Sequence, residues 1–170
     1  MTLVAANVAL PDPAGADVVR AGSAREMREA VTAAACDADA VVMAAAVADF
    51  RPADTPGEKI KKVEGAEPAP IHLAENPDIL AGLAAARRPG QVIVGFAAET
   101  NDVLEHGRRK LARKGCDLLV VNQVGEGLAF GTPDNAAVIL GADGTVVDVP
   151  LGSKEALANV VWDLVSARLE

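Results

Sequence analysis

Short runs of Val, Ala, Leu and Ile alternate along the chain with segments whose polar residues recur at helical spacing. This alternation predicts an α/β fold built on a mostly parallel sheet. The runs are almost continuously apolar, which is typical of strands covered on both faces. The expected strands are Thr2–Leu10, Asp17–Ala21, Ala40–Ala48, Gln91–Ala97 and Asp117–Asn122.

Capping residues mark two helices in the first half of the chain. Ser23 followed by Glu26 is a capping box for a helix that runs to about Cys36. Asn76 and Pro77 are expected to be the N-cap and first position of a helix that ends near Arg87.

The second half contains two more helices with a hairpin between them. Thr100 or Asn101 is expected to open a helix that Gly115 closes. Asp143-Gly144 is a hairpin turn between Ala136–Leu140 and Thr145–Val149. Ser153 then caps a last helix, Lys154–Leu169.

The segment from Phe50 to Pro70 shows no sustained hydrophobic period. It contains several prolines together with Lys59, Lys61 and Lys62. One interpretation is a solvated surface loop. Because it follows the carboxyl end of an expected strand, where ligands bind in open α/β sheets, the other interpretation is a lid.

Three expected strands end in small or polar residues, and all three ends should meet at one sheet edge. These stretches are Ala44–Pro52, with the carboxylate of Asp49, then Gly95–Thr100 and Val120–Gln123. Small side chains allow a ligand to approach the backbone closely. The sequence therefore predicts a ligand site at this edge.

The helix before Gly115 concentrates positive charge in an acidic chain. Lys110 and Lys114 are four residues apart and project from one face, while Arg109 and Arg113 form a neighbouring pair. The cluster is either a solvated face near a helix C-terminus or a clamp for a polyanion such as a triphosphate. The spacing alone leaves both interpretations open.

Composition excludes several classes of function. The 170 residues fit one domain, and 51% are hydrophobic but only 2% aromatic. Aromatic platforms for nucleic-acid bases are therefore not expected. A formal net charge of −8 opposes binding to nucleic-acid backbones and anionic membranes, so any bound anion needs a local basic cluster.

The two cysteines, Cys36 and Cys116, lie far apart and have no histidine at ligand spacing. This pattern predicts neither a disulfide framework nor a protein-held metal, and it favours a reducing cytoplasm. No apolar run is long enough for a membrane span. Glycine-rich dinucleotide and P-loop fingerprints are missing too, since the run Gly125–Gly131 leads into Thr132-Pro133 rather than a helix.

Several motifs occur together in a characteristic order. They are Ala44-Ala45-Ala46-Val47-Ala48-Asp49-Phe50-Arg51-Pro52, Lys59-Ile60-Lys61-Lys62, Asn76-Pro77-Asp78-Ile79-Leu80, Gly95-Phe96-Ala97-Ala98-Glu99-Thr100 and Arg109–Asn122. In this combination the chain closely resembles phosphopantothenate–cysteine ligase, the CoaB domain of the bifunctional coenzyme A biosynthesis flavoprotein. The resemblance covers essentially the whole chain.

The resemblance implies a Rossmann-like three-layer fold with a mostly parallel sheet, a C-terminal β-hairpin and a helix. It implies a cytoplasmic homodimer that uses CTP and Mg²⁺ to join 4′-phosphopantothenate to L-cysteine through an acyl-cytidylate. Lys59 is the expected catalytic residue, and Ala45 and Ala46 are expected to lie along the acyl intermediate. The residues that match the family's CTP-binding positions are Asp49, Lys59, Pro77, Asp78, Ile79, Leu80, Phe96, Lys110 and Lys114.

The family has an additional first strand and a glycine-rich segment before the region that matches this chain. We therefore expect a single CTP-binding ligase domain over residues 1–170 that is truncated at its N-terminus, with the flavin-dependent decarboxylase domain, and hence any flavin, outside the chain. The alternatives are a noncatalytic fragment that keeps nucleotide binding and dimerisation, and a nicotinamide-dependent oxidoreductase. The hairpin Ala136–Val149 is the expected dimer contact.

Overall fold

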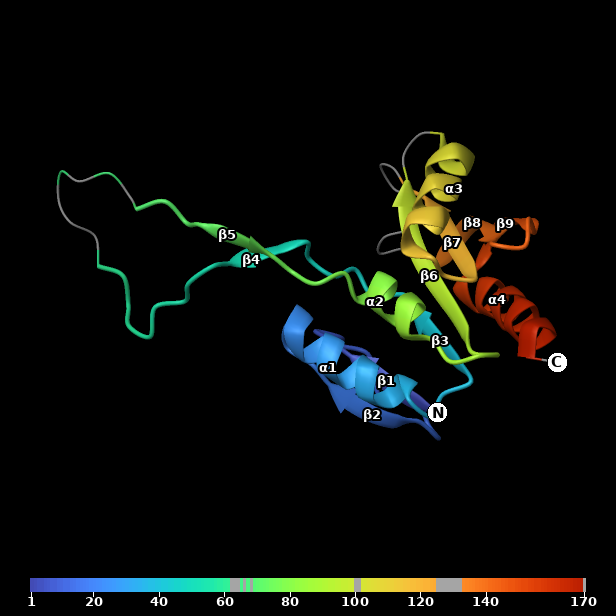
Figure 1. Ribbon diagram of the computed structural model, residues 1–170, viewed down its shortest axis with the longest axis horizontal. Helices are drawn as coiled ribbons and strands as arrows, with labels where there is room; N and C mark the ends of the chain where they lie inside the picture. Colours follow the sequence, from blue (N-terminus) through green and yellow to red (C-terminus); the bar gives the residue numbers. More distant parts are fainter. Residues whose placement is uncertain (62–64, 66, 68, 100–101, 125–132, 170) are drawn as a thin grey trace.

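The computed structural model describes residues 1–61, 65, 67, 69–99, 102–124 and 133–169 (Figure 1). Thr100, Asn101, Lys62 and the glycine-containing run 125–131 lie outside the described residues. The strands are β1 Thr2–Ala5, β2 Asp17–Arg20, β3 Ala40–Met43, β4 Phe50–Pro52, β5 Leu73–Glu75, β6 Val92–Glu99, β7 Leu118–Gln123, β8 Asp134–Gly141 and β9 Val146–Ser153. The helices are α1 Ala24–Ala35, α2 Ile79–Ala86, α3 Val103–Lys114 and α4 Lys154–Leu169.

A five-stranded sheet forms the centre of the molecule, in the order β3-β6-β7-β8-β9. β3, β6 and β7 run parallel, and the expected hairpin adds β8 and β9 in antiparallel orientation. Helix α4 covers one face through Val161 and Val165, while α2 and α3 cover the other through Ala84 and Leu111. The α/β class and the mostly parallel sheet predicted from the sequence are therefore confirmed.

The first two strands do not join this sheet, contrary to the expectation of strands covered on both faces. Within the described part of the chain β1 pairs in parallel with β2 alone, and most of the side chains of these two strands are exposed or half-buried. Helix α1 spans both parts, because Met27 and Val31 pack in one cluster with Val4 of β1 and Met43 of β3. The first strand also ends at Ala5, and Asn7 has a positive φ of 53°.

Local capping chemistry explains most helix boundaries. The Ser23 hydroxyl accepts a hydrogen bond from the Glu26 N–H at 3.3 Å, and the Ser153 hydroxyl accepts one from the Ala156 N–H at 3.1 Å. Gly115 takes the left-handed conformation at the end of α3, with a φ of 68°. These boundaries confirm the sequence predictions. The N-cap of α3 is Asp102, next to the expected but undescribed positions.

The prediction that Asn76 caps the second helix is wrong. Helix α2 begins after Asp78, whose side chain accepts a hydrogen bond from the Ala81 N–H at 3.1 Å. Aspartate and asparagine are equally good caps, so the local sequence does not choose between them. Tertiary contacts decide, because Asn76 instead donates to the Ala48 carbonyl at 2.9 Å.

The segment after β3 forms an arm that extends far from the body of the molecule (Figure 1). Its base is a two-stranded antiparallel ribbon in which Phe50 faces Glu75 and Pro52 faces Leu73. The loop predicted over Phe50–Pro70 therefore starts with a strand, which the sequence missed because proline is unfavourable in strands. No helix in the described part of the chain combines the length and hydropathy needed to cross a bilayer.

Replacing Gly95 by alanine is expected to destabilise the fold by about 1–2 kcal/mol because of overpacking. A Cβ atom at this position on β6 would clash with Leu80 Cδ2 and would lie 3.2 Å from Leu119 Cδ1. Gly82→Ala on α2 is the matched control, since a Cβ atom there meets no atom within 4 Å. Alanine favours helix by about 0.5–1 kcal/mol over glycine, so the control should be stabilised. Urea unfolding measures both changes, and equal losses at the two positions would contradict the close packing.

Candidate functional site

A cavity of about 470 Å³ opens at the carboxyl ends of β3, β6 and β7. Its wall combines the chain after β3, the start of α2, the end of β6 and one face of α3. This is the edge at which the sequence placed a ligand site, and parallel α/β sheets bind ligands there because several strands end together. The predicted site residues that line the cavity are Ala45, Ala46, Asp49, Pro77, Asp78, Ile79, Leu80, Phe96, Lys110 and Lys114.

The wall after β3 is made of small residues that leave the sheet early. β3 ends at Met43 rather than Ala48, and Ala44, Ala45 and Ala46 are exposed beside the cavity. Asn76 holds this stretch in place, since its side chain donates to the Ala48 carbonyl and its backbone N–H donates to the Asp49 carbonyl at 2.8 Å. The backbone of this stretch can therefore be approached closely by a ligand.

Arg51 connects the arm to the same wall. Its guanidinium donates to the Glu75 carbonyl and, at 3.3 Å, to Asn76 Oδ1. The first residues of the arm are thus tied to the loop that borders the cavity. A movement of the arm would act on this wall through Asn76.

The two lysines of α3 face the cavity, and each is paired with a carboxylate. Lys110 Nζ lies 2.8 Å from Glu99 Oε1, and Lys114 Nζ lies 2.5 Å from Asp78 Oδ2. Arg109 is exposed and does not line the cavity. The helix is therefore two-sided, with a solvated arginine on one side and the lysine pair directed into the site.

Both carboxylates are held in their charged form. The hydrogen bond from Lys110 lowers the pKa of Glu99 against the effect of its burial, and His106 Nδ1 lies 3.5 Å from the other oxygen. Burial raises the pKa of Asp78, but the hydrogen bonds from Lys114 and the Ala81 N–H outweigh it and the net pKa is lowered. The lysines are thus oriented before a ligand arrives.

The pairing of Glu99 with Lys110 predicts a loss of stability in acid. A carboxyl whose pKa is lower in the folded than in the unfolded chain stabilises the fold above its unfolded pKa, which is about 4.3 for Glu. That contribution disappears as the pH falls through the lower, folded pKa. The free energy of unfolding, measured from pH 6 to pH 3, should therefore fall less steeply in Glu99→Gln. Parallel curves for Glu99→Gln and the unmodified chain would contradict the pairing.

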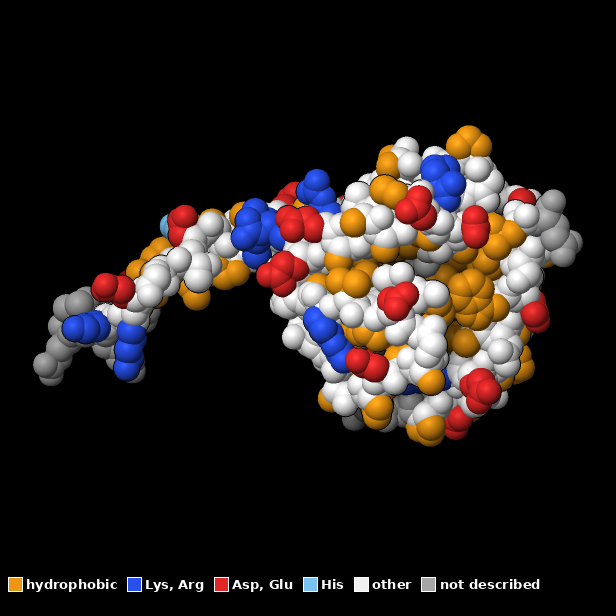
Figure 2. Space-filling view, turned by 90° about the horizontal axis from the view of Figure 1, so that it is seen from below, with side chains coloured by type: hydrophobic (Ala, Val, Ile, Leu, Met, Phe, Trp, Pro, Cys, Tyr) orange, Lys and Arg blue, Asp and Glu red, His pale blue; other side chains and the backbone are white. Residues whose placement is uncertain are grey.

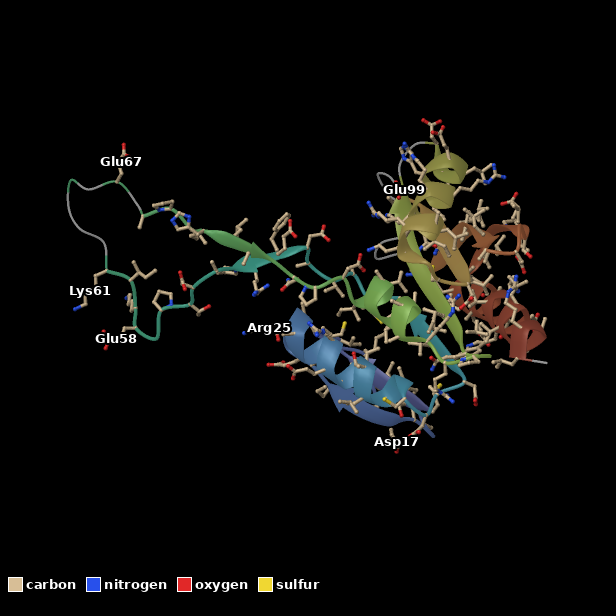
Figure 3. All side chains as sticks on the ribbon, viewed as in Figure 1. Asp17, Arg25, Glu58, Lys61, Glu67 and Glu99 are labelled. Atoms are coloured by element: carbon tan, nitrogen blue, oxygen red, sulfur yellow. The ribbon has the colours of Figure 1, made fainter. Side chains whose placement is uncertain are left out.

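Lys59 is the one predicted site residue that the cavity does not include. It is exposed and lies between Glu58 and Lys61, which Figure 3 labels toward the far end of the arm. The described residues of the loop from Arg51 to Pro70 therefore do not line their own chain's cavity. Spacing could not reveal this, since the reach of the arm depends on the pairing of β4 with β5.

Three further polar residues line the cavity that were not among the site residues matched to the family. Asn76 was predicted to be a helix cap, and Arg113 was part of the basic cluster. Asn122 was predicted only to be a polar residue at the end of a strand. The one signal for Asn122 was its position after a long apolar run.

Comparison with known proteins identifies the family. The family described as DNA/pantothenate metabolism flavoprotein C-terminal domain (DFP) matches residues 1–169. The chain belongs to this family. DFP membership agrees with the resemblance drawn from the ordered motifs.

Individual relatives support the assignment to the DFP family. A protein of Mycolicibacterium smegmatis named coenzyme A biosynthesis bifunctional protein CoaBC is 51% identical over 100% of this chain and 43% of its own length. A protein of Vibrio vulnificus with the same name is 43% identical over 93% of this chain and 39% of its own length. The chain thus spans less than half the length of these curated relatives.

A solved structure shares the fold across the whole chain. The crystal structure of the C-terminal domain of a CoaBC protein matches with a TM-score of 0.80 and 30% identity, over 99% of this chain and 74% of that one. The Rossmann-like architecture expected from the resemblance is therefore confirmed.

Proposed function

We propose that the chain is the ligase domain of a coenzyme A biosynthesis protein and joins 4′-phosphopantothenate to L-cysteine at the expense of CTP. The observation that carries the proposal is the cavity at the sheet edge, where Lys110 and Lys114 face a wall of small residues. Relatives named for coenzyme A biosynthesis, at 51% identity over the whole chain, support it. Membership in this family also argues against the oxidoreductase alternative.

The chemistry has two steps. A carboxylate oxygen of phosphopantothenate attacks the α-phosphorus of CTP, the bond to the β-phosphate breaks, and pyrophosphate leaves with the bonding electrons. The amine of cysteine then attacks the acyl carbon, CMP leaves, and the amine loses a proton as the amide forms. Negative charge concentrates on the phosphates throughout, and Lys110 and Lys114 are placed to offset it.

Mg²⁺ fits this site as a companion of the phosphates rather than as a protein-held ion. The described residues contain no cluster of three or more potential ligands. Asp78 already pairs with Lys114 and caps α2, which leaves the exposed Asp49 as the carboxylate available in the cavity. One carboxylate together with phosphate oxygens and water is a common environment for Mg²⁺. The ion supplies neutralisation of the triphosphate when bound.

Calorimetry with CTP, ATP and NAD tests the nucleotide assignment. We expect CTP to bind more tightly than either competitor. Equal binding of ATP, or a preference for NAD, would reject the CTP-dependent ligase. Because Lys59 lies away from the cavity, a noncatalytic fragment is the second candidate, and CTP binding by this chain without amide formation would favour it.

We also propose that a segment preceding residue 1 in the complete protein completes the sheet. Among the described strands β1 pairs only with β2, and β3 pairs only with β6. Helix α1 brings the two strands into one apolar cluster, in which its Met27 and Val31 pack with Val4 of β1 and Met43 of β3. One parallel strand between β1 and β3 would join the two sheets, and hydrogen exchange at Val4 and Val42 should slow when that segment is present. The decarboxylase domain, and with it any flavin, would belong to the remaining length of the complete protein.

The proposed protein is a cytoplasmic homodimer, in keeping with its two free cysteines. Two surfaces could form the dimer contact, namely the predicted hairpin β8–β9 and the arm. Figure 2 shows apolar side chains along the arm, where Phe50 is 53% and Leu73 is 62% exposed. Because both strands of the ribbon at the base of the arm carry such exposed apolar side chains, we favour the arm over the hairpin.

Charged substitutions separate the two dimer contacts. Leu73→Glu on the arm is expected to convert the dimer to a monomer, since it places a carboxylate in an apolar contact. Val146→Glu on the hairpin, where Val146 is 49% exposed, is the matched control and should leave the dimer intact. Light scattering measures the mass of each variant. If only Val146→Glu is a monomer, the hairpin and not the arm forms the dimer contact.

A further inference from the structure

Asn122 forms a neutral polar corner of the cavity. It lies near the end of β7, directly opposite Ala98 on β6. Side chains alternate along a strand, so Asn122 shares a sheet face with Val120, just as Ala98 shares one with Phe96. Asn122, Ala98 and Phe96 line the cavity. Val120 lies further along the same face of the sheet, where α4 covers it. The lysines approach from α3 on the opposite face, so the cavity has a cationic side and a neutral side.

A second amide fixes the orientation of Asn122. Asn135 lies at the start of β8 with only 7% of its surface exposed, and its Nδ2 donates to Asn122 Oδ1 at 3.0 Å. Its own Oδ1 is buried and has no hydrogen-bond partner within the described part of the chain. Buried polar atoms are normally paired because leaving one unpaired is costly. Among the described residues, the side-chain hydrogen bond that this buried amide makes is the one to Asn122.

The hydrogen bond decides which groups Asn122 can offer to a ligand. An amide oxygen has two lone pairs, so Asn122 Oδ1 can accept one more hydrogen bond, and its Nδ2 group remains available as a donor. Turning the amide over would bring the NH₂ groups of Asn122 and Asn135 against each other. Asn122 therefore presents a donor beside an acceptor, in a fixed order.

We propose that this amide pair selects cytosine over uracil, an inference that rests on the proposed binding of CTP. Cytosine carries an acceptor at N3 beside an amino donor at N4, which complements Asn122 Nδ2 and Oδ1. Uracil carries a donor at N3 beside an acceptor at O4, which opposes both groups. Phe96 on the same face supplies a ring against which a base can pack. Asn122 is the residue that contacts the base, and Asn135 is a positioning residue.

The test compares the dissociation constants of CTP and UTP by calorimetry in the chain and its variants. The unmodified chain is expected to bind CTP at least tenfold more tightly than UTP. Asn122→Asp keeps the shape but removes the donor, and the preference should fall below threefold through weaker CTP binding. Asn135→Asp accepts from Asn122 Nδ2 and turns that amide over, so the preference should shift toward UTP. Asn159→Asp, on the exposed face of α4, is the matched control and should keep the original ratio.

The outcomes separate this inference from the proposed function. If the unmodified chain binds neither nucleotide, both the function and the inference are rejected. If CTP is preferred equally in the unmodified chain and in Asn122→Asp, the function stands and the inference is overturned. A shift toward UTP in Asn135→Asp is a readout that general damage to the fold would not produce, and Asn122→Ala with an unchanged melting temperature provides a second route to the same comparison.

Discussion

Replacing Lys110 and Lys114 together by alanine is expected to weaken CTP binding by about 2–3 kcal/mol, or roughly 30- to 150-fold. Both ammonium groups face the cavity, so the substitution removes two charge-assisted hydrogen bonds to phosphate. It also leaves Glu99 and Asp78 without their cations beside the bound anion. Repulsion between these carboxylates and the triphosphate adds to the loss.

The control for this prediction lies on the same helix. Arg109→Ala removes one positive charge, half of what the double variant removes, from the exposed side of α3 away from the cavity, and should change CTP affinity less than threefold. Calorimetry at two salt concentrations measures both variants. If the double variant binds CTP with unaltered affinity, the basic residues of α3 form a solvated face and not a clamp.

Replacing Lys59 by alanine in the complete protein is expected to lower the rate of amide formation at least 100-fold, as for a lost group that offsets developing charge. CTP affinity should change less, because Lys59 lies on the arm and not in the cavity wall. Lys61→Ala, two residues along the same exposed segment, is the matched control and should keep most of the activity. Unchanged turnover in Lys59→Ala would remove its assigned role.

Mixing two inactive variants reveals which cavity Lys59 serves. Because the arm extends away from the body and Lys59 does not line the cavity, we expect the arm to reach the cavity of a second copy in the proposed dimer. A mixed dimer of Lys59→Ala with the Lys110→Ala/Lys114→Ala variant would then contain one cavity with an intact lysine pair and an intact arm lysine. Partial recovery of activity is the expected result, and no recovery would indicate that the arm folds back onto its own chain.

Local signals predicted the helices well. The Ser23 and Ser153 caps and the Gly115 terminus act within one turn of the chain, so neighbouring residues contain the information. Asn76 and Asp78 are a case in which the neighbouring residues do not contain enough information to choose the cap. Either residue could cap α2, and a hydrogen bond to Ala48, which is 28 residues away, assigns Asn76 to the cavity wall instead.

Long-range pairing explains the other differences. β4 and β5 are each 3 residues long, β4 contains Pro52, and the two strands are separated along the chain by the rest of the arm. No local pattern therefore predicts them. The separation of β1 and β2 from the main sheet likewise depends on which strands are present to pair, and not on their apolar composition.

The sequence alone determined the α/β class, the four described helices, the sheet edge at which the cavity opens and, through its ordered motifs, the family. These properties depend on periodicity, local caps and residue identity, all of which are local. Only the tertiary structure decided that Lys110 and Lys114 each hold a carboxylate, that Lys59 lies outside its own cavity, and that Asn135 orients Asn122. Such contacts join residues on different elements, and their distances and directions exist only after the chain has packed.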